Sequence, residues 1–252
     1  MATLLAVWVA LAVALNFGGA DPRLFTSLTG NSAAIRSGEV WRLFTAPFVH
    51  LPSGQGSVEH ILFALLGLYF LAPALEARWG GKRLVGFLLA AAEVGFLAQF
   101  LAESLLPRSL AAALGNDSWF GFYGALDALA IAWALSHRGA QVRLFFALPV
   151  SAEALVAFVV GINVLRIVGA AHPLEGVVTP FGGMLAGWAF GGGSPPPARR
   201  LWLAVRYAWL ERRAARARAA RPDLRVLPGG HDVGPGARPR SRKKPSDDRF
   251  LN

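Results

Sequence analysis

Few residues in the apolar part of this chain carry side chains that could do chemistry. Tyr123 and Asp127 are four residues apart in an apolar segment, so they would share one face of a helix. A carboxylate in such a segment is costly and usually faces the interior of a helix bundle or water. We therefore expect Asp127 to be neutral, or paired with His60 or with the Tyr123 hydroxyl. The alternative is that these three residues line a polar pocket that holds a lipid or an unwound segment of a client protein's helix.

Metal and thiol chemistry have little support in the sequence. The chain has no cysteine, which excludes disulfides, thiol nucleophiles and Cys-ligated metal centres. Its 5 histidines are scattered and form no HExxH motif. We therefore expect neither a metal nor another cofactor.

The composition is that of a membrane protein. Hydrophobic residues make up 54% of the 252 residues, charged residues make up 16%, and the mean hydropathy is +0.45. A soluble domain carries about 25% charged residues. A membrane-spanning helix needs about 20 mostly apolar residues. The sequence predicts an all-α fold with six spans, over residues 3–17, 58–77, 84–106, 119–136, 142–168 and 177–191.

The first of these segments has two interpretations. It could be a signal peptide with cleavage after Ala20, or it could be a retained span. Nothing basic precedes it, whereas the start of a secretory signal is normally positive. We therefore favour a retained span.

Basic residues set the predicted orientation. The net charge of +10 is concentrated in residues 194–252, which hold 15 Lys and Arg against 5 Asp and Glu. Short basic links follow the second span (Arg78, Lys82, Arg83) and the fourth (Arg138, Arg143). Positive loops stay in the cytoplasm, so both termini are predicted inside. The Ala, Arg, Gly and Pro bias fits a GC-rich bacterial genome and hence the plasma (inner) membrane.

A long outer loop is predicted between the first two spans, over residues 18–57. It is too apolar for a free linker, so it should pack on the bundle or dip into the outer leaflet. Trp41 and Arg42 are its expected anchor, because Trp suits the membrane interface and Arg can bond backbone carbonyls.

The basic C-terminal part divides into two. Residues 194–221 read as a linker and a basic amphipathic helix, and residues 222–252 as a disordered basic tail. Trp with Arg beside a bundle favours a helix that lies along anionic lipid headgroups. A docking helix for a cytoplasmic partner and contact with RNA are the alternatives; no nucleic acid is expected. The predicted lipid-binding residues are Arg199, Arg200, Trp202, Arg206, Trp209, Arg212 and Arg213.

Three motifs occur in order along the predicted spans. They are HILFA from His60, WFGFYG from Trp119 and PFGGMLAG from Pro180, with WR at Trp41 and FVH at Phe48 upstream. Together they resemble the rhomboid family of intramembrane serine proteases over residues 1–193. The resemblance implies a six-span bundle, a Ser in a GxSG motif on the fourth span and a His in HxxGxxxG on the sixth. It also implies a His and an Asn spaced HxxxN on the second span.

The chain departs from that pattern where the chemistry would occur. Tyr123 stands at the position of the Ser, Pro180 at that of the His and Ala64 at that of the Asn, while His60 fits. Serine is a weak nucleophile without a base, and Pro180 cannot act as one. We predict a pseudoprotease that binds transmembrane segments of client proteins without cleaving them. An active serine protease of this family is the alternative, and a rescue by Ser118 with His172 is a second one.

The glycines of these motifs are retained and have a packing role. Gly121 and Gly124 fit the frame on the fourth span, and Gly183 and Gly187 fit that on the sixth. Gly183, Gly187 and Gly191 recur every four residues, which places them on one face of a helix. Small residues on one face let two helices approach closely, so the sequence predicts close packing of the sixth span on the fourth.

Overall fold

The computed structural model describes residues 1–219, except 108, 112–114, 116, 138, 140, 145–147, 170–172 and 193–194. The predicted disordered tail, residues 222–252, lies outside the described residues. The chain divides into two compact units, Met1–Val205 and Arg206–Asn252. The last helix begins in the first unit and ends in the second.

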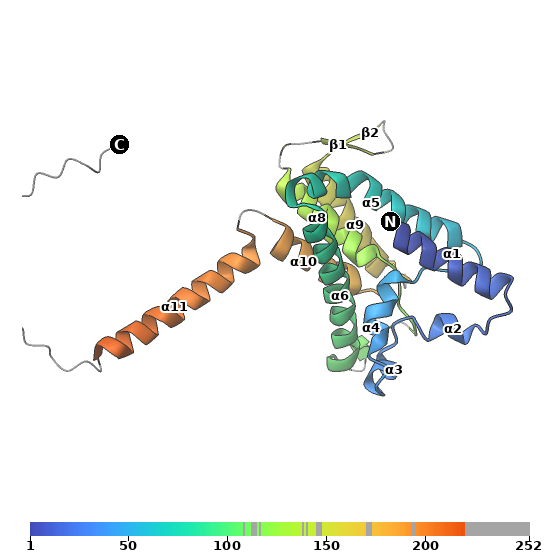
Figure 1. The fold of residues 1–252 in the computed structure, drawn as a ribbon, viewed down its shortest axis with the longest axis horizontal. Coiled ribbons are helices and arrows are strands. Elements are labelled where there is room, and N and C mark those ends of the chain that lie inside the picture. The colour runs from blue at the N-terminus through green and yellow to red at the C-terminus, as the bar shows by residue number, and fades with distance from the viewer. Residues whose placement is uncertain are drawn as a thin grey trace, which may run out of the picture. The chain divides into compact units, whose positions relative to one another are not determined.

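The described part of the chain is mostly helical, as predicted (Figure 1). The elements of the first unit are α1 (Ala2–Asn16), α2 (Arg23–Thr26), α3 (Ser32–Arg36), α4 (Trp41–Thr45), η1 (Ala46–Phe48), α5 (Ser57–Trp79), α6 (Gly81–Leu105), α8 (Tyr123–Ser136), β1 (Gln141–Leu144), β2 (Leu148–Ser151), α9 (Ala152–Val168), α10 (Thr179–Ala186) and η2 (Gly187–Gly191), a π-helical turn. Helix α11 (Pro197–Ala219) follows.

Two described helices, α5 and α6, are long and apolar enough to cross a membrane by length and composition. Helices α1 and α8 are apolar but shorter. Helices α1, α5 and α6 begin and end within three residues of the predicted spans. A single glycine, Gly80, links α5 to α6, and its φ of 80° is one that side-chain-bearing residues rarely adopt.

The prediction of one helix over 142–168 was wrong for residues 142–144 and 148–151. The strands β1 and β2 pair there in an antiparallel ladder, in which Gln141 pairs with Ser151 and Arg143 with Pro149 (Figure 1). The fold is therefore not purely α-helical. Pro149 is unfavourable inside a helix because it lacks an N–H. Helix α9 begins instead at Ala152, where the Ser151 hydroxyl accepts a hydrogen bond from the Ala154 N–H at 3.1 Å.

Two further predicted starts were too early. Helix α8 begins at Tyr123 instead of residue 119, and Gly121 lies before it with a φ of 109°. Helix α10 begins at Thr179 instead of residue 177, with Pro180 in its first turn, where the missing N–H costs no helical bond.

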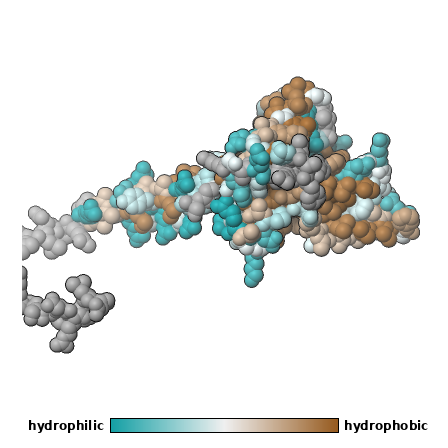
Figure 2. Space-filling view, turned by 90° about the horizontal axis from the view of Figure 1, so that it is seen from above, coloured by the Kyte–Doolittle hydropathy of each residue, from teal (hydrophilic) through white to brown (hydrophobic). Residues whose placement is uncertain are grey.

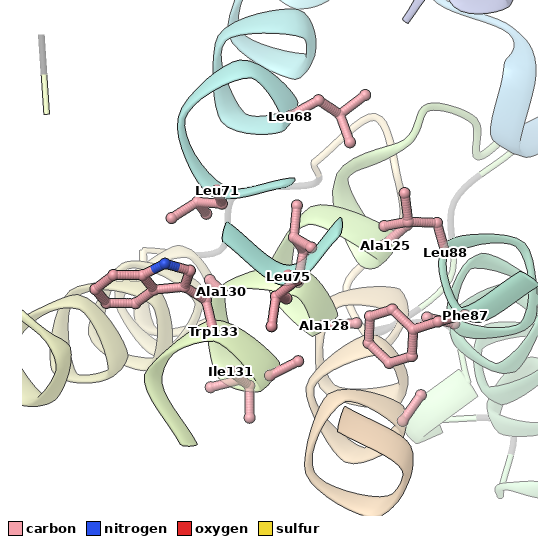
Figure 3. Close-up of a cluster of buried hydrophobic side chains, with 14 of the residues drawn as sticks. Leu68, Leu71, Leu75, Phe87, Leu88, Ala125, Ala128, Ala130, Ile131 and Trp133 are labelled. Carbon is pink, nitrogen blue, oxygen red and sulfur yellow. The ribbon is translucent and has the colours of Figure 1, made fainter. Parts of the chain in front are cut away.

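Helix α8 lies at the centre of the bundle. Most of its residues are buried, and the largest apolar cluster surrounds it with side chains of α5 and α6. Figure 3 shows Leu68, Leu71 and Leu75 of α5 and Phe87 of α6 gathered around this helix. A helix buried on nearly all sides needs small side chains, and α8 supplies a run of alanines.

The outer faces of the surrounding helices are apolar as well. Exposed hydrophobic side chains include Phe63 and Tyr69 on α5, and Phe158 and Leu165 on α9. Figure 2 shows broad apolar areas on the visible face of the bundle. Exposed apolar patches of this extent mark a surface that meets a partner or a membrane.

The glycines of α10 and of the following turn η2 lie so close to α6 and α8 that they leave no room for a Cβ. On the α6 side, a Cβ on Gly182 would lie 2.9 Å from both the Ala98 Cβ and the Gly95 Cα. On the α8 side, a Cβ on Gly183 would overlap the carbonyl oxygen of Gly124, and one on Gly187 would overlap that of Ala128. The glycine face therefore packs backbone against backbone.

Helix α11 is exposed over residues 199–218, including its aromatic residues Trp202, Tyr207 and Trp209. It lies within the segment 194–221 that was predicted to hold a linker and a helix, of which residues 220 and 221 lie outside the described residues. The Arg213 guanidinium lies 5.4 Å from the centre of the Trp209 ring, a cation–π contact.

We expect Gly183→Ala to destabilise the bundle, because the new methyl group meets a backbone carbonyl that cannot move alone. The expected loss is about 3 kcal/mol, or about 10 °C in Tm for a chain of this length. The matched control is Gly161→Ala on α9, where nothing lies within 4 Å of the added Cβ. Thermal unfolding of both variants in detergent measures the difference, and equal Tm values would contradict the close packing.

Candidate functional site

Four rings meet where the outer loop reaches the start of α5. His60 is the centre of this ring cluster, which consists of His50, His60, Phe120 and Tyr123. The ring centroid of His60 lies 5.0 Å from that of His50, 5.7 Å from that of Phe120 and 5.1 Å from that of Tyr123. Gly121 packs on the same imidazole, since a Cβ there would lie 3.1 Å from the His60 Cε1.

Tyr123 points its hydroxyl at backbone. The phenolic O–H donates to the carbonyl oxygen of His60 at 2.8 Å, so the hydrogen is already engaged. The ring nitrogens of His50 and His60 are buried and make no hydrogen bond of good geometry to any described residue. Unpartnered buried polar atoms are unusual in folded proteins and mark a place where a ligand or water can bind.

The backbone before α8 is held by the outer loop and by the segment before α10. Gly30 and Trp119 exchange two backbone hydrogen bonds, of 2.8 and 2.9 Å. The Gly121 N–H donates to the Ala46 carbonyl at 2.9 Å, and the Phe120 N–H to that of Leu174 at 2.9 Å. These bonds fix the ring cluster against the bundle without helical backbone.

Arg42 ties the outer loop together. Its guanidinium donates to the backbone carbonyls of Thr26 and Thr29, the latter at 2.9 Å, and its Nε donates to Glu39 at 2.7 Å. The Trp41 indole N–H donates to the Ser27 carbonyl at 3.2 Å. Both predicted anchor residues therefore bond loop backbone, and the Trp41 ring is half exposed.

Asp127 pairs with neither of its predicted partners. Its Oδ2 accepts a long hydrogen bond of 3.4 Å from the Nδ2 of Asn163 on α9, and Asn163 also donates to the Val159 carbonyl at 2.9 Å. The Tyr123 hydroxyl is unavailable because it is bonded to His60. Asn163 was not among the predicted site residues, although it is a polar residue in an otherwise apolar run.

An ion pair lies one turn further along α9. Arg166 Nη1 donates to Glu175 Oε1 at 2.6 Å, and the Glu175 side chain is 5% exposed while that of Arg166 is 39% exposed. Burial raises the pKa of Glu175, and the nearby Arg166 guanidinium acts in the opposite direction. The pair joins α9 to the segment before α10.

The remaining predicted positions are those of the oxyanion Asn, the catalytic His and the alternative Ser–His pair. Ala64 and Pro180 are buried. Ser118 is half-buried, while His172 lies outside the described residues, so this pair stays untested. In the described part of the chain, no group of three or more His, Cys, Asp or Glu residues could hold a metal ion.

The chain matches a known protein family over most of its helical bundle. A family model described as Rhomboid domain matches residues 37–193, more than half of the chain. The chain belongs to the rhomboid family.

A relative in plants is recognisable at the sequence level. The chain is similar to RHOMBOID-like protein 12, mitochondrial, of Arabidopsis thaliana, with 28% identity over 139 residues. The aligned region is 52% of this chain and 40% of that relative, so the chain spans less than half of the relative's length. Rhomboid proteins are embedded in membranes, which agrees with the two long apolar helices α5 and α6.

In this rhomboid chain the structure brings together some of the predicted site residues. His60 and Tyr123 lie in one cluster, with Gly121 against them, and Gly124 packs on α10. Asp127 lies one turn from Tyr123 but turns to α9. The sequence analysis missed His50 as a neighbour of His60; the residue was visible only as part of the FVH motif.

We expect His50 to make the rhomboid fold less stable in acid. Burial lowers the pKa of His50 from 6.5 to about 4, with the Phe48 backbone acting in the opposite direction. Between these pH values, His50 is therefore protonated in the unfolded chain and neutral in the folded chain. Stability is full above pH 6.5 and falls as the pH drops toward 4, by roughly 3 kcal/mol from this residue.

The measurement is Tm against pH for the unmodified chain and for His50→Gln in the same detergent. The variant should show a shallower fall of Tm below pH 6.5, because glutamine does not titrate. Parallel curves would show that His50 takes no part in the acid sensitivity.

Proposed function

We propose that this rhomboid-family membrane protein is a pseudoprotease, which binds transmembrane segments of client proteins and does not cleave them. The observation that carries the proposal concerns Tyr123, which stands where the family pattern has its nucleophile. Its hydroxyl donates a hydrogen bond of 2.8 Å to a backbone carbonyl. A hydroxyl whose hydrogen is held by a carbonyl has no base to take its proton, so it is a poor nucleophile.

The residue set supports the same conclusion for the base and the oxyanion donor. Pro180 has no titratable group and Ala64 has no hydrogen-bond donor. Loss of one oxyanion donor costs about 2.7–4 kcal/mol in an acyl-transfer site. Among the described residues, no serine or threonine hydroxyl is hydrogen-bonded to a histidine ring.

Client binding is supported by unused hydrogen-bonding capacity. Among the described residues, the two buried ring nitrogens of His60 have no hydrogen-bond partner, and Asp127 accepts a long hydrogen bond of 3.4 Å from Asn163. An unwound stretch of a client helix offers N–H and C=O groups that need such partners inside a membrane. We propose that His60, Tyr123 and Asp127 contact that stretch.

We further propose that six segments cross the bilayer, namely α1, α5, α6, α8, α9 and α10 with η2. Helices α8 and α10 are short, but the backbone before them is buried in the protein and hydrogen-bonded through Trp119, Phe120 and Gly121. Non-helical backbone is tolerated at membrane depth under that condition. The basic residues at one end of α5 and α6 support cytoplasmic termini in a bacterial inner membrane.

The cleavage test compares the unmodified chain with Tyr123→Ser, Pro180→His and Ala64→Asn combined. The unmodified chain should leave a model transmembrane substrate intact, because it lacks an activated oxygen and a base. The triple variant should gain cleavage and fluorophosphonate labelling.

Cleavage by the unmodified chain would show an active rhomboid protease and overturn the proposal. Labelling that disappears in Ser118→Ala would identify Ser118 as the nucleophile instead. The matched control combines Tyr123→Ala with Pro180→His and Ala64→Asn, since it keeps the other two changes and lacks the oxygen.

The client test uses cross-linking in native membranes followed by isolation of the full chain. We expect His60→Ala combined with Asp127→Ala to lower the recovered membrane proteins about tenfold, because two polar partners of an unwound segment are lost. Glu59→Ala is the control, since Glu59 is exposed beside His60 on α5. Equal recovery from the double variant and the control would contradict client binding at this site.

A further inference from the structure

A cavity lined by arginines lies at the opposite end of α5 from the ring cluster. It has a volume of about 560 Å³ and no carboxylate among its lining residues. All of its lining residues belong to the first unit. They are Arg78, Trp79, Arg83, Leu135, Ser136, Pro195, Pro196, Arg199 and Leu203.

Three helix ends and the start of α11 bring these residues together. Arg78 and Trp79 end α5, Arg83 is in the first turn of α6, and Ser136 ends α8. The Arg78 guanidinium donates to the Ser136 carbonyl, which joins two of these ends. The cavity is about 27 Å along α5 from His60, at a rise of about 1.5 Å per residue, so it is separate from the proposed client site.

The guanidinium groups are not neutralised within the described part of the chain. Neither of the salt bridges found there involves Arg78, Arg83 or Arg199. Arg83 lies 5.3 Å from the centre of the Trp79 ring, which holds its guanidinium at the cavity without removing its charge. Arg78 uses one donor on Ser136 and keeps the others. Three neighbouring cations without a counter-ion favour binding of an anion.

The chemistry of the lining selects the kind of anion. Guanidinium groups bind phosphate through paired N–H donors. Leu135, Leu203 and Trp79 add an apolar side to the same cavity, which suits an amphiphile better than a free ion. The volume lies within the range of about 300–1,000 Å³ found for small-molecule sites, so it accommodates a glycerophosphate headgroup.

We propose that this cavity is a binding site for the phosphate headgroup of an anionic phospholipid. Arg83 and Arg199 would donate hydrogen bonds to the phosphate, and Arg78 would add a third positive charge beside it. The apolar lining residues would contact the glycerol and the upper acyl chain. The site is distinct from general attraction between a basic helix and a membrane surface, because it is built from α5, α6 and α8 as well as from the start of α11. It does not depend on whether the protein cleaves its clients.

The test measures lipid binding by the full chain in nanodiscs. The probe is phosphatidylglycerol titrated into phosphatidylcholine, and bound lipid is read by native mass spectrometry. Arg83→Gln combined with Arg199→Gln should weaken phosphatidylglycerol retention about tenfold, equivalent to about 1.4 kcal/mol. Arg216→Gln combined with Arg218→Gln removes the same charge from the exposed part of α11 and should change retention less than about twofold.

The outcomes separate the sources of binding. Equal losses in both double variants would show that the basic surface as a whole attracts the lipid, and would overturn the site. If inorganic phosphate alone raised the Tm of the chain, and phosphatidylglycerol raised it no further, the lipid would not be the ligand. A lower Tm of the cavity variant in pure phosphatidylcholine would reveal a folding defect. In that case Arg83→Lys combined with Arg199→Lys, which keeps the charge, must retain phosphatidylglycerol better than the glutamine variant, or the proposal fails.

Discussion

Backbone contact between α10 and its two neighbours is the constraint on which the rest of the structure depends. Glycines at 182, 183 and 187 leave no space for a Cβ against α6 and α8. Van der Waals packing of this kind replaces the hydrophobic effect between helices in a lipid environment, where apolar side chains gain nothing from leaving lipid. The same close contact fixes the position of Pro180 and, through Gly124, the first turn of α8.

The start of α8 in turn fixes the ring cluster. Tyr123 is the first residue of that helix, and the backbone before it is bonded to the outer loop at Gly30 and Ala46. The loop is held by Arg42, whose guanidinium satisfies carbonyls that have no partner in a helix. A chain of backbone hydrogen bonds therefore connects a surface loop to the most buried helix of the bundle.

This arrangement is compatible with the pseudoprotease that we propose. The close glycine contacts hold helices at a fixed spacing whether or not a nucleophile and a base are present. Tyr123 is hydrogen-bonded to backbone and residue 180 is proline, so in our proposal the retained helix packing serves the binding of client segments. The cationic cavity at the other end of α5 rests on separate helix ends and is independent of those substitutions.

The sequence by itself determined the mostly helical fold, the rhomboid motifs and the glycine face, and it predicts the loss of the residues that activate hydrolysis. These follow from residue type and spacing along one helix, which are local properties. Only the tertiary structure decided that Asp127 meets Asn163, that His50 lies against His60, and that three arginines share one cavity. Asp127 and Asn163 lie on different helices, Arg199 is far along the chain from Arg78 and Arg83, and a non-helical loop separates His50 from His60, so no helical spacing encodes these contacts. The strand pair of 141–144 and 148–151 and the late start of α8 were not predicted, because apolar runs of strand, loop and helix have similar sequences.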